Sequence, residues 1–134
     1  MGLILVTHDL GVVAQVCHRV SVMYAGEMVE ITTTAELFRQ PRHPYTLGLL
    51  SSVPRIEDAE RKLRPIPGTL PDPRHLPTGC RFHPRCPWAS EECRRAPIPM
   101  IEIGEGHFTR CIKHEQLIGV SDFPASDSHD RGIV

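Results

Sequence analysis

The chain has 134 residues, the size of one ordinary domain or of two small modules. Its formal charge is −1, from 15 basic and 16 acidic residues, so its composition does not point to nucleic acid or an anionic membrane surface as a partner. No apolar run approaches the roughly 20 residues that a membrane-spanning helix needs, and the N-terminal stretch lacks the basic start of a signal peptide. We therefore expect a soluble, cytoplasmic chain.

The first predicted elements are a strand and a helix. Residues 2–7 (GLILVT) form a continuous apolar run, which is typical of a parallel strand buried on both faces. Residues 9–17 have helical periodicity, and Thr7 or Asp9 is the expected cap. The apolar face of this helix comprises Leu10, Val13, Ala14 and Cys17.

A hairpin and two helices follow. Residues 19–24 and 28–31 alternate as strands around the turn AGEM. Thr33 and Glu36 have the spacing of a capping box, which predicts a helix that stops before Pro41. The next helix has proline at its first position, and its predicted apolar face comprises Tyr45, Leu49, Leu50 and Val53.

The composition changes after Pro54. Twelve of the 13 prolines lie between positions 41 and 99, and residues 55–64 form a charged linker or short helix. Residues 65–79 are expected to be extended and rich in turns. A short helix is predicted within residues 88–96 with Ser90 near its start, followed by a hairpin that turns at residues 104–106. We place the domain boundaries at 1–54 and 55–118, with a loose polar tail at 119–134.

His8 stands where the first predicted strand ends. In open α/β sheets ligands bind beyond the carboxyl ends of the strands, and the following helix directs free N–H groups at an anion there. His8 is therefore a candidate phosphate contact. The alternative is a loop histidine beside a helix cap.

Four cysteines form a second candidate site. Five, six and seventeen residues separate Cys80, Cys86, Cys93 and Cys111. Zinc sites usually contain tighter pairs, so this spacing favours a [4Fe–4S] cluster; zinc, and unligated thiols or a disulfide, remain alternatives. In a segment with so small a core, such a group is expected to stabilise the fold rather than to act in redox chemistry.

The neighbours of these cysteines suggest further contributions. Nearby arginines are expected to lower the thiol pKa values and offset an anionic cluster, and they are Arg81, Arg85, Arg94, Arg95 and Arg110. His83 and His107 are possible substitute ligands. Cys17, on the first helix, is expected to be a small buried apolar residue.

The stretch LILVTHDLGVVAQVCHRVSVMYAGEMVE resembles the H-loop region of ATP-binding cassette (ABC) transporter ATPases. HPYTLGLLSSVPR, PIPG and GCRFHPRC narrow the resemblance, over about residues 2–114, to the dipeptide/oligopeptide or nickel importer subfamily. The resemblance implies an α/β fold: the end of a P-loop NTPase domain, then a small irregular α+β cysteine-rich domain. It implies that His8 contacts the γ-phosphate of ATP, with magnesium present in the intact subunit. Some members carry an iron–sulfur cluster in the cysteine-containing region.

The ATPase motifs that such a subunit needs are missing from these residues. The chain has no Gly-Lys pair, no GxxxxGK[ST] loop and no apolar run ending in Asp-Glu. We therefore expect the chain alone not to hydrolyse ATP. The strand at 2–7 would also lack its neighbours, so the isolated chain is expected to be marginally stable or prone to aggregate.

The implied function is that of part of the ATP-binding subunit of a peptide-importing ABC transporter. The implied partners are a second ATP-binding subunit, two permease subunits and an extracytoplasmic peptide-binding protein, at the cytoplasmic face of a bacterial membrane. The alternative is a standalone metal- or iron–sulfur-binding interaction module without ATPase activity. A truncated, non-functional product is a third reading.

Overall fold

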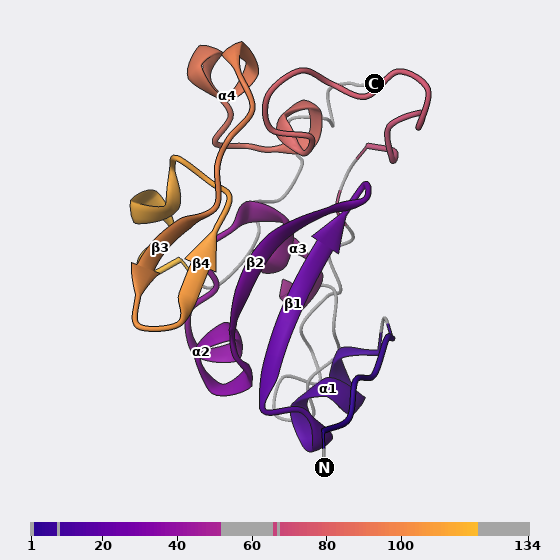
Figure 1. Ribbon diagram of the computed structural model, residues 1–134. Coiled ribbons are helices and arrows are strands. Elements are labelled where there is room, and N and C mark those ends of the chain that lie inside the picture. Colours follow the sequence, from indigo (N-terminus) through magenta and orange to yellow (C-terminus); the bar gives the residue numbers. More distant parts are fainter. Residues whose placement is uncertain (1, 8, 52–65, 67, 121–134) are drawn as a thin grey trace, which may run out of the picture.

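A computed structural model describes residues 2–7, 9–51, 66 and 68–120 of the chain. Its centre is a four-stranded antiparallel sheet in the order β1-β2-β4-β3 (Figure 1). The strands are β1 (Arg19–Tyr24), β2 (Glu27–Thr33), β3 (Ile101–Gly104) and β4 (His107–Thr109). The helices are α1 (Leu10–Val16), α2 (Thr34–Arg39), α3 (Pro44–Ser51) and α4 (Glu91–Arg95), with short 3-10 turns η2 (His83–Arg85) and η3 (His114–Leu117).

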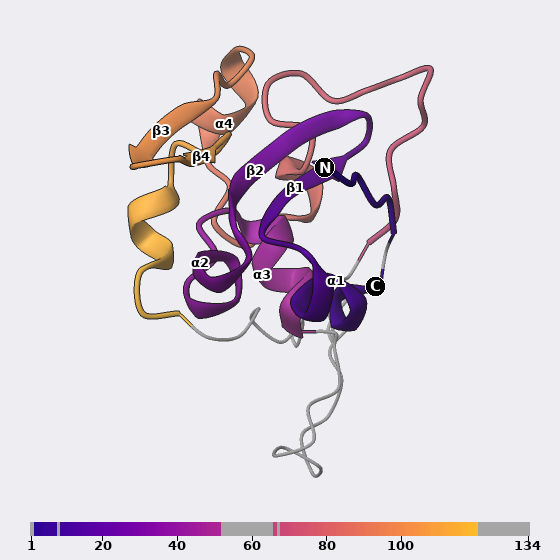
Figure 2. The same cartoon turned by 60° about the horizontal axis from the view of Figure 1, so that its bottom comes forward.

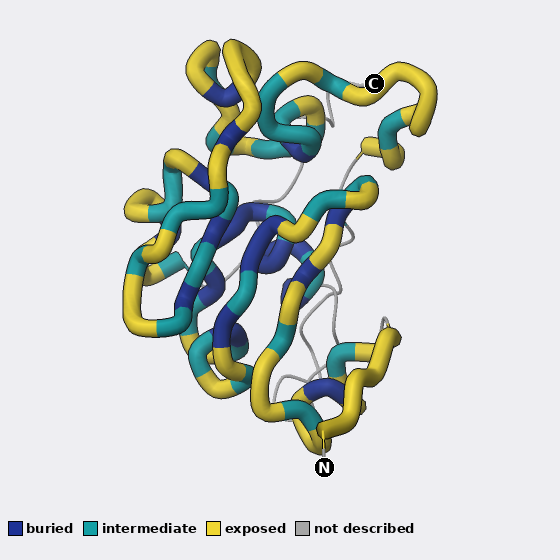
Figure 3. The backbone as a smooth tube through the Cα atoms, in the orientation of Figure 1, coloured by how far each residue is buried: buried dark blue, intermediate teal, exposed yellow. Residues whose placement is uncertain are grey.

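Residues 2–7 do not form the predicted strand. The segment has no strand assignment, and Leu3, Ile4 and Val6 are 86%, 90% and 92% exposed (Figure 3). A parallel strand needs neighbouring strands to satisfy its backbone and cover its side chains, and no strand in the described residues pairs with this segment. The prediction of a buried parallel strand at 2–7 is therefore wrong for the structure of this chain.

Helix α1 was predicted correctly, including its cap. Asp9 Oδ1 accepts hydrogen bonds from the N–H groups of Gly11 and Val12, at 2.9 and 3.3 Å. Of the predicted apolar face, Val13 is buried, Ala14 is exposed and Cys17 is half-buried. The prediction of a buried Cys17 is therefore only partly met.

The β1–β2 hairpin was also predicted correctly. Its two-residue turn places Ala25 and Gly26 at φ 50° and 80°. Two positive φ angles characterise the tight turn whose twist matches that of the flanking strands. Alanine is unfavourable there, and Arg81 supports the turn by donating from Nη1 to the Ala25 carbonyl at 2.6 Å.

Helices α2 and α3 pack against one face of the β1–β2 hairpin (Figure 2). Thr33 Oγ1 accepts from the Glu36 N–H at 3.2 Å, and α2 ends at Arg39 before Pro41, as predicted. The predicted single apolar face of α3 is wrong: Leu47 is almost completely buried, and small residues on other sides of the helix are buried too. The helix lies inside the molecule, so its burial has no helical period.

The second hairpin joins the first one in a single sheet. Strands β3 and β4 turn at Gly104–Gly106, as the sequence predicts. Strand β4 then pairs with β2, with Thr109 opposite Glu30 and Phe108 opposite Ile31. Residues from both sides of position 54 therefore build one sheet; the charged linker predicted at 55–64 lies outside the described residues.

The core draws on both sides of position 54 as well. It consists of Val22, Tyr24, Val29, Leu37, Leu47, Phe82 and Leu117. The rings of Tyr24 and Tyr45 lie 4.6 Å apart between centroids, and Phe82 contacts both rings at 5.2 and 5.5 Å. Cys80 and Cys86 pack against this core, so the aromatic group borders the cysteine-containing loops.

Candidate functional site

The four predicted cysteines line one pocket. Cys80, Cys86, Cys93 and Cys111 are brought together from a loop, the end of η2, helix α4 and the segment after β4. The remaining wall is largely apolar and is formed by His43, Pro44, Phe82, His83, Ala89, Ile98, Ile112 and Lys113. We call this the cysteine pocket.

A glycine allows two of the cysteine-bearing segments to meet. The N–H of Cys80 donates to the carbonyl of Cys93 at 2.8 Å. Gly79 has φ +71°, and a Cβ built on it would lie 2.3 Å from that same carbonyl oxygen. No other residue fits at position 79 without moving one of the two backbones.

Backbone N–H groups are directed at several of the sulfur atoms. The N–H of Lys113 donates to Cys111 Sγ at 3.3 Å. Backbone hydrogen bonds from Phe82 and His83 act to lower the pKa of Cys80. Those from Trp88 and Ala89 act in the same way on Cys86. Such N–H···S contacts are common where cysteine sulfur carries negative charge in metal sites.

Three of the pocket thiols have raised pKa values, which favours their protonated form. Burial is the largest cause and raises the pKa of Cys86 and of Cys111 to about 12; it also raises the pKa of Cys80. The thiols reinforce the effect, since each of these three pKa values is also raised by neighbouring cysteines. The prediction that arginines lower these pKa values is therefore wrong.

The arginines bind other parts of the chain instead. Arg85 donates to the Tyr24 hydroxyl at 3.2 Å and to the Ile66 carbonyl at 3.1 Å. Arg110 donates to the carbonyls of Met28 and Ile98 at 2.8 and 2.9 Å. These guanidinium groups tie the pocket's loops to the β1–β2 hairpin, which is a structural use of their charge and their several donors.

Two observations bear on whether these cysteines could bind a metal. All five cysteines are free thiols. Within residues 2–7, 9–51, 66 and 68–120, no group of three or more His, Cys, Asp or Glu side chains is arranged to hold a metal ion. What the structure does provide is a donor set of four thiols around one apolar pocket, within electrostatic reach of one another and with backbone N–H groups at the sulfurs.

One residue of the pocket, His43, was not predicted from the sequence. It is completely buried, and its Nδ1 accepts from the N–H of Tyr45, the second residue of α3, at 3.1 Å. It therefore caps this helix, a role for which histidine is not among the preferred residues. Burial lowers the pKa of His43 to about 3, so the ring is neutral.

Of the two histidines proposed as substitute ligands, only one lies in the cysteine pocket. His83 lines the cysteine pocket, where burial lowers its pKa. His107 is not in the lining, and its Nε2 lies 2.6 Å from Glu30 Oε2 between β4 and β2. His107 is thus part of a buried hydrogen-bonded pair with Glu30 rather than of the cysteine pocket.

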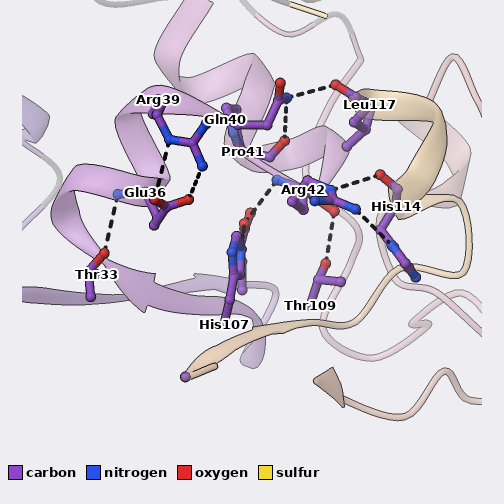
Figure 4. Close-up of polar contacts among 12 residues, drawn as sticks. Thr33, Glu36, Arg39, Gln40, Pro41, Arg42, His107, Thr109, His114 and Leu117 are labelled. Carbon is purple, nitrogen blue, oxygen red and sulfur yellow. Dashed lines mark hydrogen bonds and ion pairs between the residues drawn. The ribbon is translucent and has the colours of Figure 1, made fainter. Parts of the chain in front are cut away.

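A second polar cluster surrounds that pair, centred on Arg42 in the link between α2 and α3 (Figure 4). The Arg42 N–H donates to Glu30 Oε2 at 2.9 Å, and its carbonyl accepts from Thr109 Oγ1 at 2.9 Å. Its guanidinium reaches the His114 carbonyl at 3.1 Å and the ring at 3.3 Å. This cluster joins the α2–α3 link to β4 and η3. Its residues are far apart in the sequence, and their spacing did not predict it.

His8 lies outside the described residues, so its role as a phosphate contact stays a prediction. Asp9, next to it, opens α1 as expected. No helix in the described ranges is long and apolar enough to cross a membrane.

Comparison with known proteins identifies the class. Residues 29–93 match the family model of the oligopeptide/dipeptide transporter C-terminal region. This match covers β2, α2, α3, η2 and three of the four pocket cysteines. Residues 29–93 therefore have the sequence of the C-terminal region of oligopeptide/dipeptide transporters.

Individual relatives agree with the family match. A Brucella ovis protein named for peptide import and ATP binding is 49% identical over 123 residues, which cover 87% of this chain and 36% of that protein. The oligopeptide transport ATP-binding protein AppD of Bacillus subtilis is 46% identical, covering 86% of this chain and 35% of its own. OppD of Salmonella typhimurium, with the same description, is 46% identical over 112 residues, which cover 84% of this chain and 33% of that protein. The chain thus spans about a third of the length of these relatives.

Proposed function

We propose that the chain is part of the ATP-binding subunit of an ABC transporter that imports peptides, in which ATP binding and hydrolysis drive transport. The observation that carries this proposal is the family match over residues 29–93, together with relatives named as oligopeptide transport ATP-binding proteins. In this function α3 and the Arg42 cluster hold the ATPase-like segment and the cysteine-rich segment together.

Within this function, His8 contacts the γ-phosphate of ATP and helps to organise the attacking water. Support comes from the family resemblance of this stretch and from the place of His8 directly before the capped helix α1. The residues that would bind the other phosphates and magnesium are not in these 134 residues. The chain by itself therefore does not hydrolyse ATP. ATP turnover by the purified chain that His8→Ala abolishes would contradict this.

The partners in this proposal are a second ATP-binding subunit, two permease subunits and an extracytoplasmic peptide-binding protein. The site of action is the cytoplasmic face of a bacterial membrane. The relatives' printed names support transport and ATP binding, and the remaining partners follow from the general organisation of such importers.

The test is affinity purification of the tagged chain from detergent-solubilised membranes of its own source cells. We expect permease and ATP-binding sequences to co-purify, and we expect them to be lost when the tagged chain carries a disruptive substitution in its core, such as Leu37→Asp. Recovery of the folded chain alone, from the soluble fraction, would favour the standalone interaction module instead.

We further propose that the four pocket thiols hold a [4Fe–4S] cluster. Such a cluster spreads its four ligands over several ångströms, and the four thiols line one pocket. The N–H groups at Cys80, Cys86 and Cys111 would stabilise the thiolates that ligation requires. When bound, the cluster would staple the loops of a small core.

Metal analysis separates the cluster from its alternatives. Anaerobically purified chain is expected to be brown and to contain iron and acid-labile sulfide in equal amounts. Zinc without sulfide would favour the zinc alternative, and metal-free protein would leave unligated thiols. Serine substitution of Cys93 should abolish iron binding, whereas Cys17→Ser is the matched control, because Cys17 lies outside the pocket and should leave the iron content unchanged.

A further inference from the structure

The cysteine pocket contains one polar side chain that the proposed function does not use. His43 is 0% exposed and lines the pocket with the four cysteines. It reaches the pocket from the N-terminus of α3, so its backbone is fixed by a helix and not by one of the cysteine loops.

The hydrogen bond at one ring nitrogen determines where the proton sits on the other. Nδ1 accepts from the Tyr45 N–H at 3.1 Å and therefore carries no proton. An imidazole whose Nδ1 accepts a hydrogen bond is neutral and holds a single proton. In this tautomer the proton is on Nε2, which makes Nε2 a hydrogen-bond donor.

This donor makes no well-formed hydrogen bond within the described residues. Nε2 is buried and has no partner at hydrogen-bond geometry. The backbone of Arg110, one residue before Cys111, is the competing partner: it acts to raise the pKa of His43, but the contact is too poorly aligned to satisfy the N–H in full. A buried N–H without an acceptor is unfavourable, and such groups in native proteins usually have a specific reason.

We infer that the Nε2–H of His43 donates a hydrogen bond to a sulfur atom held in the cysteine pocket. This inference rests on the proposed cluster and deepens it: the acceptor is a cysteine thiolate or a sulfide of the [4Fe–4S] group. Hydrogen bonds to cluster sulfur favour the reduced form, which carries more negative charge. The neutral ring of His43 therefore raises the reduction potential of the cluster.

Two amide substitutions separate the two ring nitrogens. In His43→Asn, the short side chain keeps an acceptor for the Tyr45 N–H, as helix-capping asparagine does, but it has no donor at the distance of Nε2. In His43→Gln, the longer side chain carries an amide N–H at about the reach of Nε2. The Asn variant thus removes the proposed hydrogen bond while keeping the cap, and the Gln variant is its matched control.

The measurements are the midpoint potential of the cluster, followed by EPR, and the coupling of ¹⁵N-labelled histidine to the reduced cluster, followed by pulsed EPR. We expect wild-type protein to show the ¹⁵N coupling. We expect His43→Asn to lose it and to shift the potential to a lower value, and His43→Gln to keep a potential close to that of wild type.

The outcomes are distinguishable from those of the parent proposal. Wild-type protein without iron overturns both the cluster and the role of His43. Iron-loaded wild-type protein that shows no ¹⁵N coupling overturns the role of His43 alone, and this readout needs no variant to fold. An unchanged potential in iron-loaded His43→Asn has the same consequence.

Discussion

Glu30 and His107 form a buried hydrogen-bonded pair across two neighbouring strands, with 2.6 Å between Oε2 and Nε2. Glu30 comes from the first hairpin and His107 from the second, and the two residues are 77 positions apart in the chain. Glu30 is 0% exposed and His107 is 8% exposed. The pair therefore joins the two segments at a position where water cannot replace either partner.

Removing one partner of this pair should be strongly destabilising. In His107→Ala the Glu30 carboxylate stays buried without its partner, and we expect a loss of about 3 kcal/mol in the free energy of unfolding. Urea unfolding followed by circular dichroism measures it. Arg39→Gln, which breaks the exposed Glu36–Arg39 pair, should leave the unfolding midpoint almost unchanged. Equal midpoints for the two variants would contradict a special role of the buried pair.

Replacement of Gly79 by alanine should disrupt the cysteine pocket. The new Cβ would meet the Cys93 carbonyl, and the left-handed backbone adds a cost of about 1–2 kcal/mol on its own. Gly119→Ala is the matched control, because Gly119 has φ +83° and open space around its Cβ position. We expect Gly79→Ala to lose clearly more unfolding free energy than Gly119→Ala, and to lose bound iron as well; similar losses would show that the close contact is not needed.

His43 should make the metal-free chain sensitive to acid. Its pKa is about 3 when folded and about 6.5 when unfolded, so the folded state excludes a proton that the unfolded chain binds. The stability that this provides is present above pH 6.5 and is lost as the pH falls toward 3. Between pH 7 and pH 5, wild type should lose about 2 kcal/mol more than His43→Asn does. Parallel unfolding profiles for the two proteins would contradict a neutral buried ring.

Gln40 should hold the segment that follows η3. Its side-chain amide donates to the Leu117 carbonyl at 2.7 Å and accepts from the Gly119 N–H at 2.8 Å. Gln40→Ala leaves both groups without these partners, and we expect a loss of about 1–3 kcal/mol. Faster hydrogen exchange of the Gly119 amide is the direct readout. Gln116→Ala, at an exposed position nearby, should leave that exchange rate unchanged.

Local elements could be predicted because their signals are local. Asp9 caps α1, Thr33 caps α2, and Gly106 takes the positive φ of the second hairpin turn. Each of these depends on backbone groups within a few residues, so the sequence contains the whole interaction. The strand expected at 2–7 failed for the opposite reason, because a strand exists only together with the strands that pair with it.

The sites show the same division. The sequence pointed to four cysteines as one set, and the structure places all four around one pocket. It also suggested that the arginines tune the thiols, whereas the structure uses Arg85 and Arg110 to tie loops to the first hairpin. Which acceptor a long cationic side chain reaches depends on segments far away in the chain.

By itself, the sequence determined the hairpins, the helix boundaries, the thiol set and the family resemblance. The tertiary structure alone decided that β4 pairs with β2, that Glu30 faces His107, and that His43 enters the cysteine pocket with an unpaired Nε2. The physical reason is range: caps and turns are satisfied by neighbours in sequence, whereas burial, ion pairing and proton affinity depend on what the folded chain brings alongside.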